Sequence, residues 1–257
     1  MSRLYIIIPV YNEEENIFTL FRDCRALADE VVGRFDVSFI LVDDGSSDNT
    51  LEFVKKEVNE LPLEVLSHET NQGPGAAFAT AFSWLSDKIG SDDWVITMEG
   101  DNTSRCDLIQ VMLNRSNEGF DVVLASPYMY GGGFTETTFL RRLLSSGANL
   151  LVKDLLGIQG ILTVSSFFRL YRSSAIIRMQ RIFSPRILER PGFESMVELI
   201  MKMTMLKLSI SEVAMQLDSS LRQGKSKMRI VRTIRGYLTL WFRKSSWEKM
   251  IVRASEQ

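Results

Sequence analysis

Two carboxylates flank a glycine in Glu99-Gly100-Asp101, directly after the apolar run Trp94–Met98, which is typical of a short buried strand. Side chains two residues apart can face the same space, and carboxylate oxygens are ligands that Mg²⁺ and Mn²⁺ prefer. Such an ion would bridge a substrate diphosphate and neutralise the charge that builds up on a leaving group. An acidic pair in a turn is more often solvated surface, so the strand-end position is what favours a metal site.

A second acidic cluster, Asp43-Asp44-Gly45-Ser46, ends the apolar run Val37–Val42. Carboxylates at such a strand end can accept hydrogen bonds from a ribose or a base, although a turn followed by a helix cap explains the segment equally well. Gly73-Pro74-Gly75 is typical of a tight loop that lets the backbone approach a ligand. Its glycine spacing matches neither a P-loop nor a dinucleotide fingerprint, so alone it is a weak phosphate signal.

Hydrolytic and disulfide chemistry find little support in the sequence. His68 is the only histidine, and no Ser or Cys accompanies it in a nucleophile motif. Cys24 and Cys106 are far apart and lack metal-ligand spacing, which favours buried, reduced thiols in a reducing compartment. We also expect no signal peptide, and no transmembrane helix because no run of about 18 uninterrupted apolar residues occurs.

Alternating elements must position these clusters. The hydrophobic share of 45% and the charged share of 24% are ordinary for a folded chain of 257 residues and argue against disorder. Strand-like runs are expected at Leu4–Val10, Val37–Val42, Leu63–Ser67, Trp94–Met98 and Val122–Ala125, with helical stretches between them. The alternation predicts an α/β fold with a mostly parallel sheet covered on both faces. Ligands of such sheets bind outside the carboxyl ends of the strands, where the polar clusters fall.

The charge distribution is uneven. The net charge is −2, yet the segment from Arg222 to Arg253 holds ten basic residues and one acid, Glu248. This segment therefore carries +9 and the remainder of the chain −11. A basic tail on an acidic body predicts an anionic partner that the tail alone contacts.

Taken in order, these and further segments resemble the motifs of the family 2 inverting glycosyltransferases, which have the GT-A fold. In the first half they are Ile8-Pro9-Val10-Tyr11-Asn12-Glu13, Val42–Asp48, Asn71–Ala77 and Glu99-Gly100-Asp101. In the second half they are Ser126-x-Tyr128 with Gly131-Gly132, Arg141–Ser145, Phe168–Arg172, Gly192-Phe193-Glu194 with Glu198, and Arg222–Lys227. The last segment is similar to that of the dolichyl- or polyprenyl-phosphate mannosyl- and glucosyltransferases. The resemblance spans residues 4 to 228 and is specific for the family, but not for the sugar donor.

The resemblance implies a role for each matching residue. The nucleotide-sugar would contact Pro9, Tyr11, Asn12, Glu13, Val42, Asp43, Asp44, Gly73, Gly75 and Gly100. Glu99 and Asp101 would hold the divalent metal, Mg²⁺ or Mn²⁺. The acceptor or its phosphate would contact Arg141, Arg142, Arg169, Arg222, Lys225 and Lys227. The candidates for direct catalysis are Asp101, Glu194, Arg222 and Lys225.

Departures from the family pattern concern the acceptor side and the metal. Glu99 replaces the first Asp of the metal motif and extends its reach by one methylene. Pro127 stands where many members have Arg, which removes a phosphate contact. Thr163 and Phe167 stand where members often have Asp and Gly. These changes leave the acceptor details and the donor preference open.

The acceptor decides which chemistry the chain must supply. A sugar hydroxyl needs a general base, for which Glu194 is the candidate. A lipid phosphate is already anionic at pH 7 and needs positioning and charge compensation instead. The basic segment Arg222–Lys227 favours the lipid phosphate, with Arg141 or Arg142 assisting. We therefore expect a hexosyltransferase that moves a sugar from GDP-mannose or a UDP-hexose onto a polyprenyl or dolichyl phosphate.

Two units are expected, a GT-A domain at residues 1–228 and a basic amphipathic tail at 229–257. Met228–Trp247 mixes arginines with aliphatic and aromatic residues, which predicts a helix lying in a membrane interface. Each basic residue near an anionic leaflet adds about 1 kcal/mol. The alternative is a helix docked on the body with its arginines solvated. The first interpretation predicts a peripheral protein at the cytoplasmic face of a membrane.

Other partners and functions stay open. A chain without transmembrane helices would need a membrane subunit to present a lipid acceptor, and a homo-oligomer stays open as well. No motif for reading nucleic acid accompanies the basic tail. The main rival is a family 2 transferase that acts on a saccharide hydroxyl. A nucleotidyltransferase would carry a glycine-rich signature where Tyr11-Asn12-Glu13 stands. A non-catalytic relative is the last alternative, because of Glu99 and Pro127.

Overall fold

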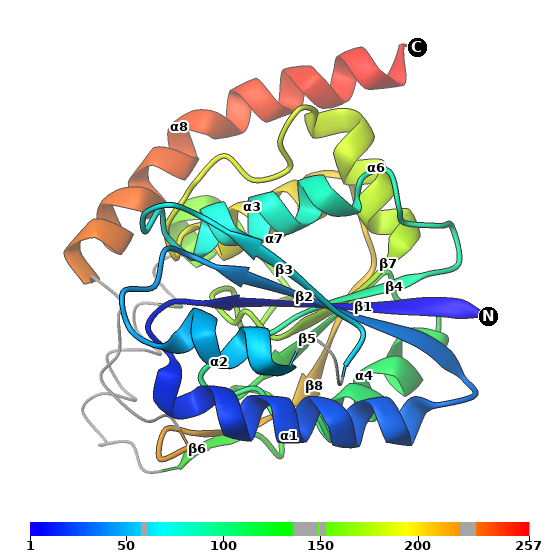
Figure 1. Cartoon of the computed structure of the whole chain (residues 1–257). Coiled ribbons are helices and arrows are strands. Elements are labelled where there is room, and N and C mark those ends of the chain that lie inside the picture. Colours follow the sequence, from blue (N-terminus) through cyan, green and yellow to red (C-terminus); the bar gives the residue numbers. More distant parts are fainter. Residues whose placement is uncertain (58–60, 136–148, 150–152, 222–229, 257) are drawn as a thin grey trace.

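The computed structural model describes residues 1–57, 61–135, 149, 153–221 and 230–256, and within them the chain forms one seven-stranded sheet and one small ribbon (Figure 1). The sheet has the order β3-β2-β1-β4-β7-β5-β8. Its strands are β1 (Ser2–Val10), β2 (Phe35–Asp43), β3 (Leu63–Ser67), β4 (Trp94–Thr97), β5 (Val122–Ser126), β7 (Arg169–Arg172) and β8 (Ile210–Ala214). The ribbon pairs β6 (Gly133–Thr135) with β9 (Gln216–Asp218).

The sheet is mostly parallel, as the alternation of the sequence predicts. β1 pairs in parallel with β2 and β4, β2 with β3, and β5 with β8. The exception is β7, which lies between β4 and β5 and is antiparallel to both. The sequence does not mark this strand as an apolar run, because two of its four residues are arginines.

Helices cover both faces of the sheet (Figure 1). The described helices are α1 (Glu14–Val31), α2 (Thr50–Glu57), α3 (Pro74–Leu85), α4 (Leu108–Asn117), α6 (Ser173–Phe183), α7 (Ser195–Met205) and α8 (Ile230–Ser255). Helix α1 begins with Glu14 and Glu15, which complement the positive end of the helix dipole. Pro74 opens α3, a position where its missing N–H leaves no bond unmade.

Successive strand residues serve two separate cores. Ile6 and Leu41 point into the core under α1 and α4, whereas Ile7 and Ile40 point into the core under α3, α6 and α7. A strand that is apolar on both faces is what a parallel sheet between two helical layers requires. The buried strands leave their carboxyl ends as the edge where polar loops can gather.

Helix α8 packs against α6 and α7, on the outside of the helical layer that α3, α6 and α7 form (Figure 1). Its Leu240 and Trp247 are fully buried in the core on that side of the sheet. The expected boundary at residue 228 falls within 222–229, which lie outside the described residues. Among the described residues, no helix is long and apolar enough to cross a membrane.

Candidate active site

The loops after β1 and β2 are cross-linked through Asn12. Its backbone N–H donates to Ser46 Oγ over 2.9 Å, and its side-chain Oδ1 accepts from the Ser47 N–H over 2.8 Å. Asn12 has a φ of +51°, a left-handed conformation that Asn tolerates better than most residues. The backbone N–H of Glu13 donates to Thr50 Oγ1 over 2.8 Å. The two nucleotide motifs predicted from the sequence thus form a single rigid edge.

The carboxylate of Asp44 organises the next loop. Its Oδ1 lies 2.7 Å from His68 Nδ1 and accepts the Gln72 N–H over 2.9 Å. Its Oδ2 accepts from Asn71 Nδ2 over 2.8 Å and from the Gly73 N–H over 2.7 Å. Both oxygens are therefore engaged within the protein, and Asp44 is buried.

This geometry argues against two of the predicted nucleotide contacts. Asp44 holds the 68–73 loop instead of presenting its oxygens to a ribose or base. Val42 is fully buried, because its side chain packs in the hydrophobic core on the α3 side of the sheet and does not reach the loops. His68, for which the sequence offered no role, links Asp44 to Thr80 Oγ1 of α3 over 2.9 Å.

The remaining residues of this edge lie at the strand ends. Pro9 pairs with Val42 in register and is only partly buried, and Asp43 is buried with its Oδ1 accepting the Ser46 N–H over 3.3 Å. Tyr11 is partly buried beyond the end of β1. Gly100 packs against Pro9 and Val10, which brings the Glu99–Asp101 turn to the same edge. Predicted donor and metal residues therefore meet at the carboxyl end of the sheet.

Gly73 and Gly75 make a close approach, but to the chain itself. The Gly75 N–H donates to the Pro191 carbonyl over 2.8 Å. A Cβ on Gly73 would collide with the Pro191 carbonyl oxygen, and one on Gly75 with the Arg190 carbonyl oxygen. The space expected for a ligand is thus occupied by the 190–191 backbone, which explains the glycines without a phosphate.

Glu99 and Asp101 lie close enough to influence each other. Glu99 accepts from Ser104 Oγ through Oε2 and from the Phe167 N–H over 3.3 Å through Oε1. Asp101 is buried and accepts from Thr103 Oγ1 over 2.5 Å and from the Thr103 N–H over 3.1 Å. Burial raises the pKa of Glu99, and the negative charge of Asp101 raises it further.

These residues fit a divalent cation. A cation between Glu99 and Asp101 would offset the repulsion between two carboxylates that lie close together and are shielded from water. Among the described residues no group of three or more His, Cys, Asp or Glu could hold a metal. Two protein carboxylates completed by substrate phosphate oxygens and water is a common way to bind Mg²⁺.

Phe167, one of the departures from the family pattern, connects this carboxylate pair to the acceptor side. Its N–H reaches Glu99, and its ring stacks on Phe193 with centroids 5.4 Å apart. The ring also packs against Phe78 of α3 at 5.4 Å. A glycine at position 167 would leave this space empty, so the larger side chain fills a gap between α3 and the segment that leads to Glu194.

Glu194 precedes the first residue of α7 and is covered by α8. It is 6% exposed, and a Cβ on Gly236 of α8 would lie 2.6 Å from its carboxyl carbon. Among the described residues, its carboxylate forms no hydrogen bond or ion pair. Its charge contributes, after burial, to raising the pKa of Tyr237 to about 12. Helix α8 therefore forms one wall around the buried Glu194 carboxylate.

Arg169 does not face any site. It is 0% exposed and donates to the carbonyls of Ser166, Met196 and Val164 over 2.7, 2.9 and 2.9 Å. Burial lowers the pKa of Arg169. The geometry argues against the prediction that it binds the acceptor phosphate; it joins β7 to α7 instead. Arg141, Arg142, Arg222, Lys225 and Lys227 lie outside the described residues and stay predictions.

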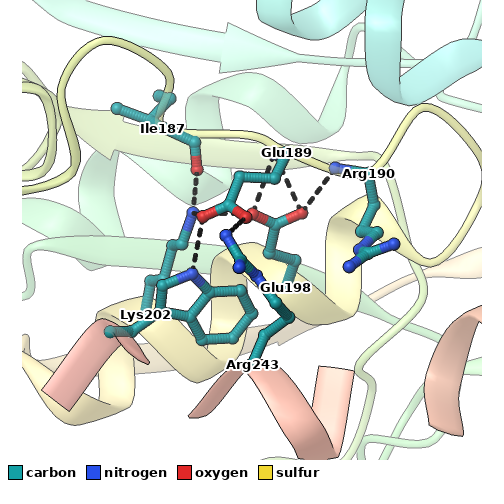
Figure 2. Close-up of polar contacts among 7 residues, drawn as sticks. Ile187, Glu189, Arg190, Glu198, Lys202 and Arg243 are labelled. Carbon is teal, nitrogen blue, oxygen red and sulfur yellow. Dashed lines mark hydrogen bonds and ion pairs between the residues drawn. The ribbon is translucent and has the colours of Figure 1, made fainter. Parts of the chain in front are cut away.

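The sequence analysis missed an ionic cluster that joins the segment before α7 to α7 and α8 (Figure 2). Lys202 and Glu198 of α7 pair at 2.6 Å, and both side chains are 0% exposed. Glu189 accepts from Trp247 Nε1 over 2.7 Å and from Arg243. Glu198 and Lys202 stand four residues apart, which is the spacing of a helical ion pair, and that was the signal available in the sequence.

Comparison with known proteins agrees with this geometry. Dolichol-phosphate mannosyltransferase from Pyrococcus furiosus is 28% identical over 253 residues, covering 98% of this chain and 66% of that protein. Undecaprenyl-phosphate 4-deoxy-4-formamido-L-arabinose transferase from Salmonella paratyphi A is 31% identical over 125 residues, covering 48% of this chain and 36% of that protein. This chain thus spans about two thirds of the first relative and about a third of the second.

The fold has solved counterparts. Glucosyl-3-phosphoglycerate synthase from Mycobacterium tuberculosis, in complex with Mn²⁺, UDP and phosphoglyceric acid, superposes with a TM-score of 0.64 at 16% identity. The superposition covers 93% of this chain and 78% of that one. Residues 5–179 match the family described as glycosyl transferase family 2. With strand-end motifs, fold and family match in agreement, this chain belongs to glycosyl transferase family 2.

Proposed function

We propose that this chain transfers a sugar from a nucleotide-sugar to a polyprenyl phosphate, with inversion at the anomeric carbon. The observation that carries the proposal is the meeting of the donor motifs and the Glu99–Asp101 pair at one sheet edge. Both relatives described above are named for transfer to a polyprenyl phosphate, which supports the same acceptor class here. The nucleotide and the sugar, GDP-mannose or a UDP-hexose, are for experiment to determine.

The donor would lie over the carboxyl ends of β1, β2 and β4. Asn12 and Asp44 keep the loops there in one arrangement, so the nucleotide meets a preformed surface. Glu99 and Asp101 would hold Mg²⁺ or Mn²⁺, and such an ion, when bound, offsets negative charge on the departing diphosphate. The Mn²⁺-bound structure of the mycobacterial synthase supports metal use within this fold.

The acceptor phosphate needs no base, because it is already anionic at neutral pH. What it needs is positioning and charge compensation, and these increase the rate by holding the reacting oxygen close to the anomeric carbon. Arg222, Lys225 and Lys227, with Arg141 or Arg142, are the proposed ligands for these phosphates. In the sequence, the first three stand between β9 and α8, and the last two stand between β6 and β7.

A saccharide hydroxyl acceptor is the second candidate, and one observation favours it. Glu194 is a buried carboxylate without a partner among the described residues, which is the condition of a general base waiting for a substrate proton. In that case Glu194 would take the proton of the hydroxyl as the oxygen attacks the sugar. In the lipid-phosphate case, Glu194 would instead orient α7 or the basic residues of the acceptor site.

We further propose that α8 rests on an anionic membrane. The helix buries Leu240 and Trp247 against the body and exposes Leu238, Trp241 and Phe242 on the opposite side. Trp241 is 54% and Phe242 74% exposed, which is unusual for large aromatic side chains without a partner surface. Exposed basic residues, Arg235, Lys249 and Arg253, accompany them. A helix with this composition suits the headgroup region of a bilayer.

A donor and acceptor panel tests the proposal. GDP-mannose, UDP-glucose and other GDP- or UDP-hexoses are incubated with a polyprenyl phosphate or with saccharides, and the products are identified by mass spectrometry. We expect a polyprenyl-phosphate sugar that forms only with MgCl₂ or MnCl₂ present. Transfer to a saccharide alone, abolished by Glu194→Gln, would replace the lipid-phosphate acceptor with the second candidate. No product from any pair would contradict both.

A further inference from the structure

The buried ionic cluster of α7 fixes the backbone of residues 187–190. Glu198 accepts the N–H groups of Glu189 over 2.9 and 3.1 Å and of Arg190 over 2.9 Å. Lys202 Nζ donates to the Ile187 carbonyl over 2.9 Å (Figure 2). An unpaired charge in this desolvated region would destabilise the folded chain, so the cluster favours a single backbone conformation of residues 187–190.

Helix α8 joins the same segment from the other side through Glu189. Trp247 Nε1 donates to its Oε1 over 2.7 Å, and Arg243 donates to its Oε2. Lys202 Nζ lies 3.7 Å from Glu189 Oε1 and 4.7 Å from the centre of the Trp247 ring. Burial alone raises the pKa of Glu189, but the bonds from Trp247 and Arg243 outweigh it and lower the pKa. Glu189 therefore faces the cluster and α8 at once.

Further along the chain, this segment contacts residues 68–76, the loop between β3 and α3 with the first turn of α3, which we call the donor loop. The Pro191 carbonyl accepts the N–H groups of Gly75 over 2.8 Å and of Ala76 over 3.3 Å, at the start of α3. Asp44 holds the other side of that loop through the Gly73 N–H over 2.7 Å. A shift of residues 189–191 would therefore shift the loop directly, because hydrogen bonds join the two backbones.

We propose that Glu189 is a positioning residue that couples the docking of helix α8 to the geometry of the donor loop. The proposal rests on the proposed function, since it assigns nucleotide binding to the edge that this loop completes. The chain of contacts runs from Trp247 and Arg243 to Glu189, along the backbone to Pro191, and across to Gly75. Helix α8 is then part of the donor site as well as the membrane contact.

The test compares two substitutions, at Glu189 and at Trp247, with matched control substitutions at exposed positions of α8. Glu189→Gln removes the charge, and Trp247→Phe removes the N–H donor but keeps an aromatic ring. Glu248→Gln and Trp241→Phe make the same chemical changes at exposed positions of α8. Binding of GDP and of UDP, each with MgCl₂, is measured by calorimetry well below the thermal transition of every variant.

We expect the dissociation constant of the bound nucleotide to rise about threefold to tenfold in Glu189→Gln and Trp247→Phe, and to stay unchanged in both controls. The double variant should bind no more weakly than Glu189→Gln alone, because both changes break one path. A lower thermal midpoint with an unchanged dissociation constant would mean that the contacts only stabilise the fold, and would overturn the proposal. If Glu189→Gln does not fold, Trp247→Phe alone decides.

Failure of the proposed function has a different signature. A wild-type chain that binds neither GDP nor UDP would contradict nucleotide-sugar transfer before any variant is measured. A wild-type chain that binds one of them, with variants that bind it equally well, would leave that function intact and remove only the coupling.

Discussion

The donor edge and the α7–α8 side of the molecule are built in opposite ways. At the donor edge, each polar residue follows the end of its own strand, and short bonds such as Asn12 to Ser46 and Asp44 to Gly73 join neighbouring loops. On the α7–α8 side, the key residues come from segments far apart in sequence, and a buried ion pair holds them. The donor edge follows from the position of polar residues after each strand, whereas the α7–α8 contacts depend on how distant segments come together in the fold.

This difference separates chemistry from support. The donor edge brings groups to a surface where a substrate can reach them. On the α7–α8 side, Glu198 and Lys202 are fully buried, and the proposal is that this side acts on the site through the backbone of residues 187–191. Substitutions of the Glu99–Asp101 pair should therefore change activity more than stability, and substitutions of the buried Glu198–Lys202 pair should change stability more than activity.

The largest expected effect is at the metal pair. Asp101→Ala removes one of two carboxylates and should lower transfer about a thousandfold, since a bound ion contributes several kcal/mol to the transition state. Rates are measured across a Mn²⁺ titration. Asp107→Ala, an exposed acid paired with Arg105, is the control and should keep its activity. Full activity of Asp101→Ala would remove the metal assignment.

The next effect belongs to the opposite region. Lys202→Met keeps the length of the side chain but leaves Glu198 buried without its cation, which should lower the free energy of unfolding by about 3–5 kcal/mol. Denaturant titration measures it. Lys249→Met, at an exposed position of α8, should change little. Adding Glu198→Gln to Lys202→Met should recover part of the loss, and a loss under about 1 kcal/mol would contradict the role given to this pair.

A third substitution tests whether Asp44 supports the loop or contacts the nucleotide. Asp44→Asn turns one acceptor into a donor that faces N–H groups, so the free energy of unfolding should fall by about 1–3 kcal/mol. Asp87→Asn, at an exposed position, is the control. A weaker nucleotide affinity without any loss of stability would restore Asp44 as a direct ligand.

The membrane contact offers a smaller effect. Trp241→Ser with Phe242→Ser removes two exposed aromatic side chains, and binding to anionic liposomes should weaken at least about tenfold. Sedimentation with vesicles measures it. The thermal midpoint should not move, because neither side chain packs in the core. Deleting the whole helix is a poorer test, since it would also expose the cavity left by Trp247. Unchanged sedimentation would direct attention to the 222–229 segment.

The smallest effect is a pH dependence. The lowered pKa of Glu189 means that its charged form stabilises the folded chain at pH above about 4.3, and that this contribution disappears as the pH falls through the lowered folded value. The difference in unfolding free energy between wild type and Glu189→Gln should therefore shrink in acid. Denaturant curves at several pH values measure it, and a constant difference would show that charge plays no part.

The sequence predicts the donor edge well for a physical reason. Parallel strands end at one edge of a sheet, so motifs that follow strands must meet, and the predicted mostly parallel sheet between helical layers is confirmed. It predicts roles within that edge less well, because only contacts reveal that Asp44 and Gly75 serve the chain itself. Arg169 shows the same limit: a motif places an arginine, and burial decides what it binds.

The sequence left two interpretations of α8 open, a helix in contact with a membrane and a helix docked on the body, and the structure has features of both. Docking uses Leu240 and Trp247 on one stripe, while Leu238 and Phe242 form the other. Composition alone cannot separate two apolar stripes that alternate along one helix. The contacts of Glu189 with Arg243 and Trp247 could not be predicted for a related reason, since no spacing rule connects residue 189 to residue 247.

Strand β7 also dictates an order of assembly. It stands between β4 and β5, yet its residues 169–172 are made long after both of these strands. The block β3-β2-β1-β4 can pair from the first hundred residues alone, whereas β5 and β8 have no place beside it until β7 arrives. Because non-local pairing is slow, we expect two stages in refolding. Pulsed hydrogen exchange should find amides of β1 and β2 protected before those of β5, and simultaneous protection would contradict this order.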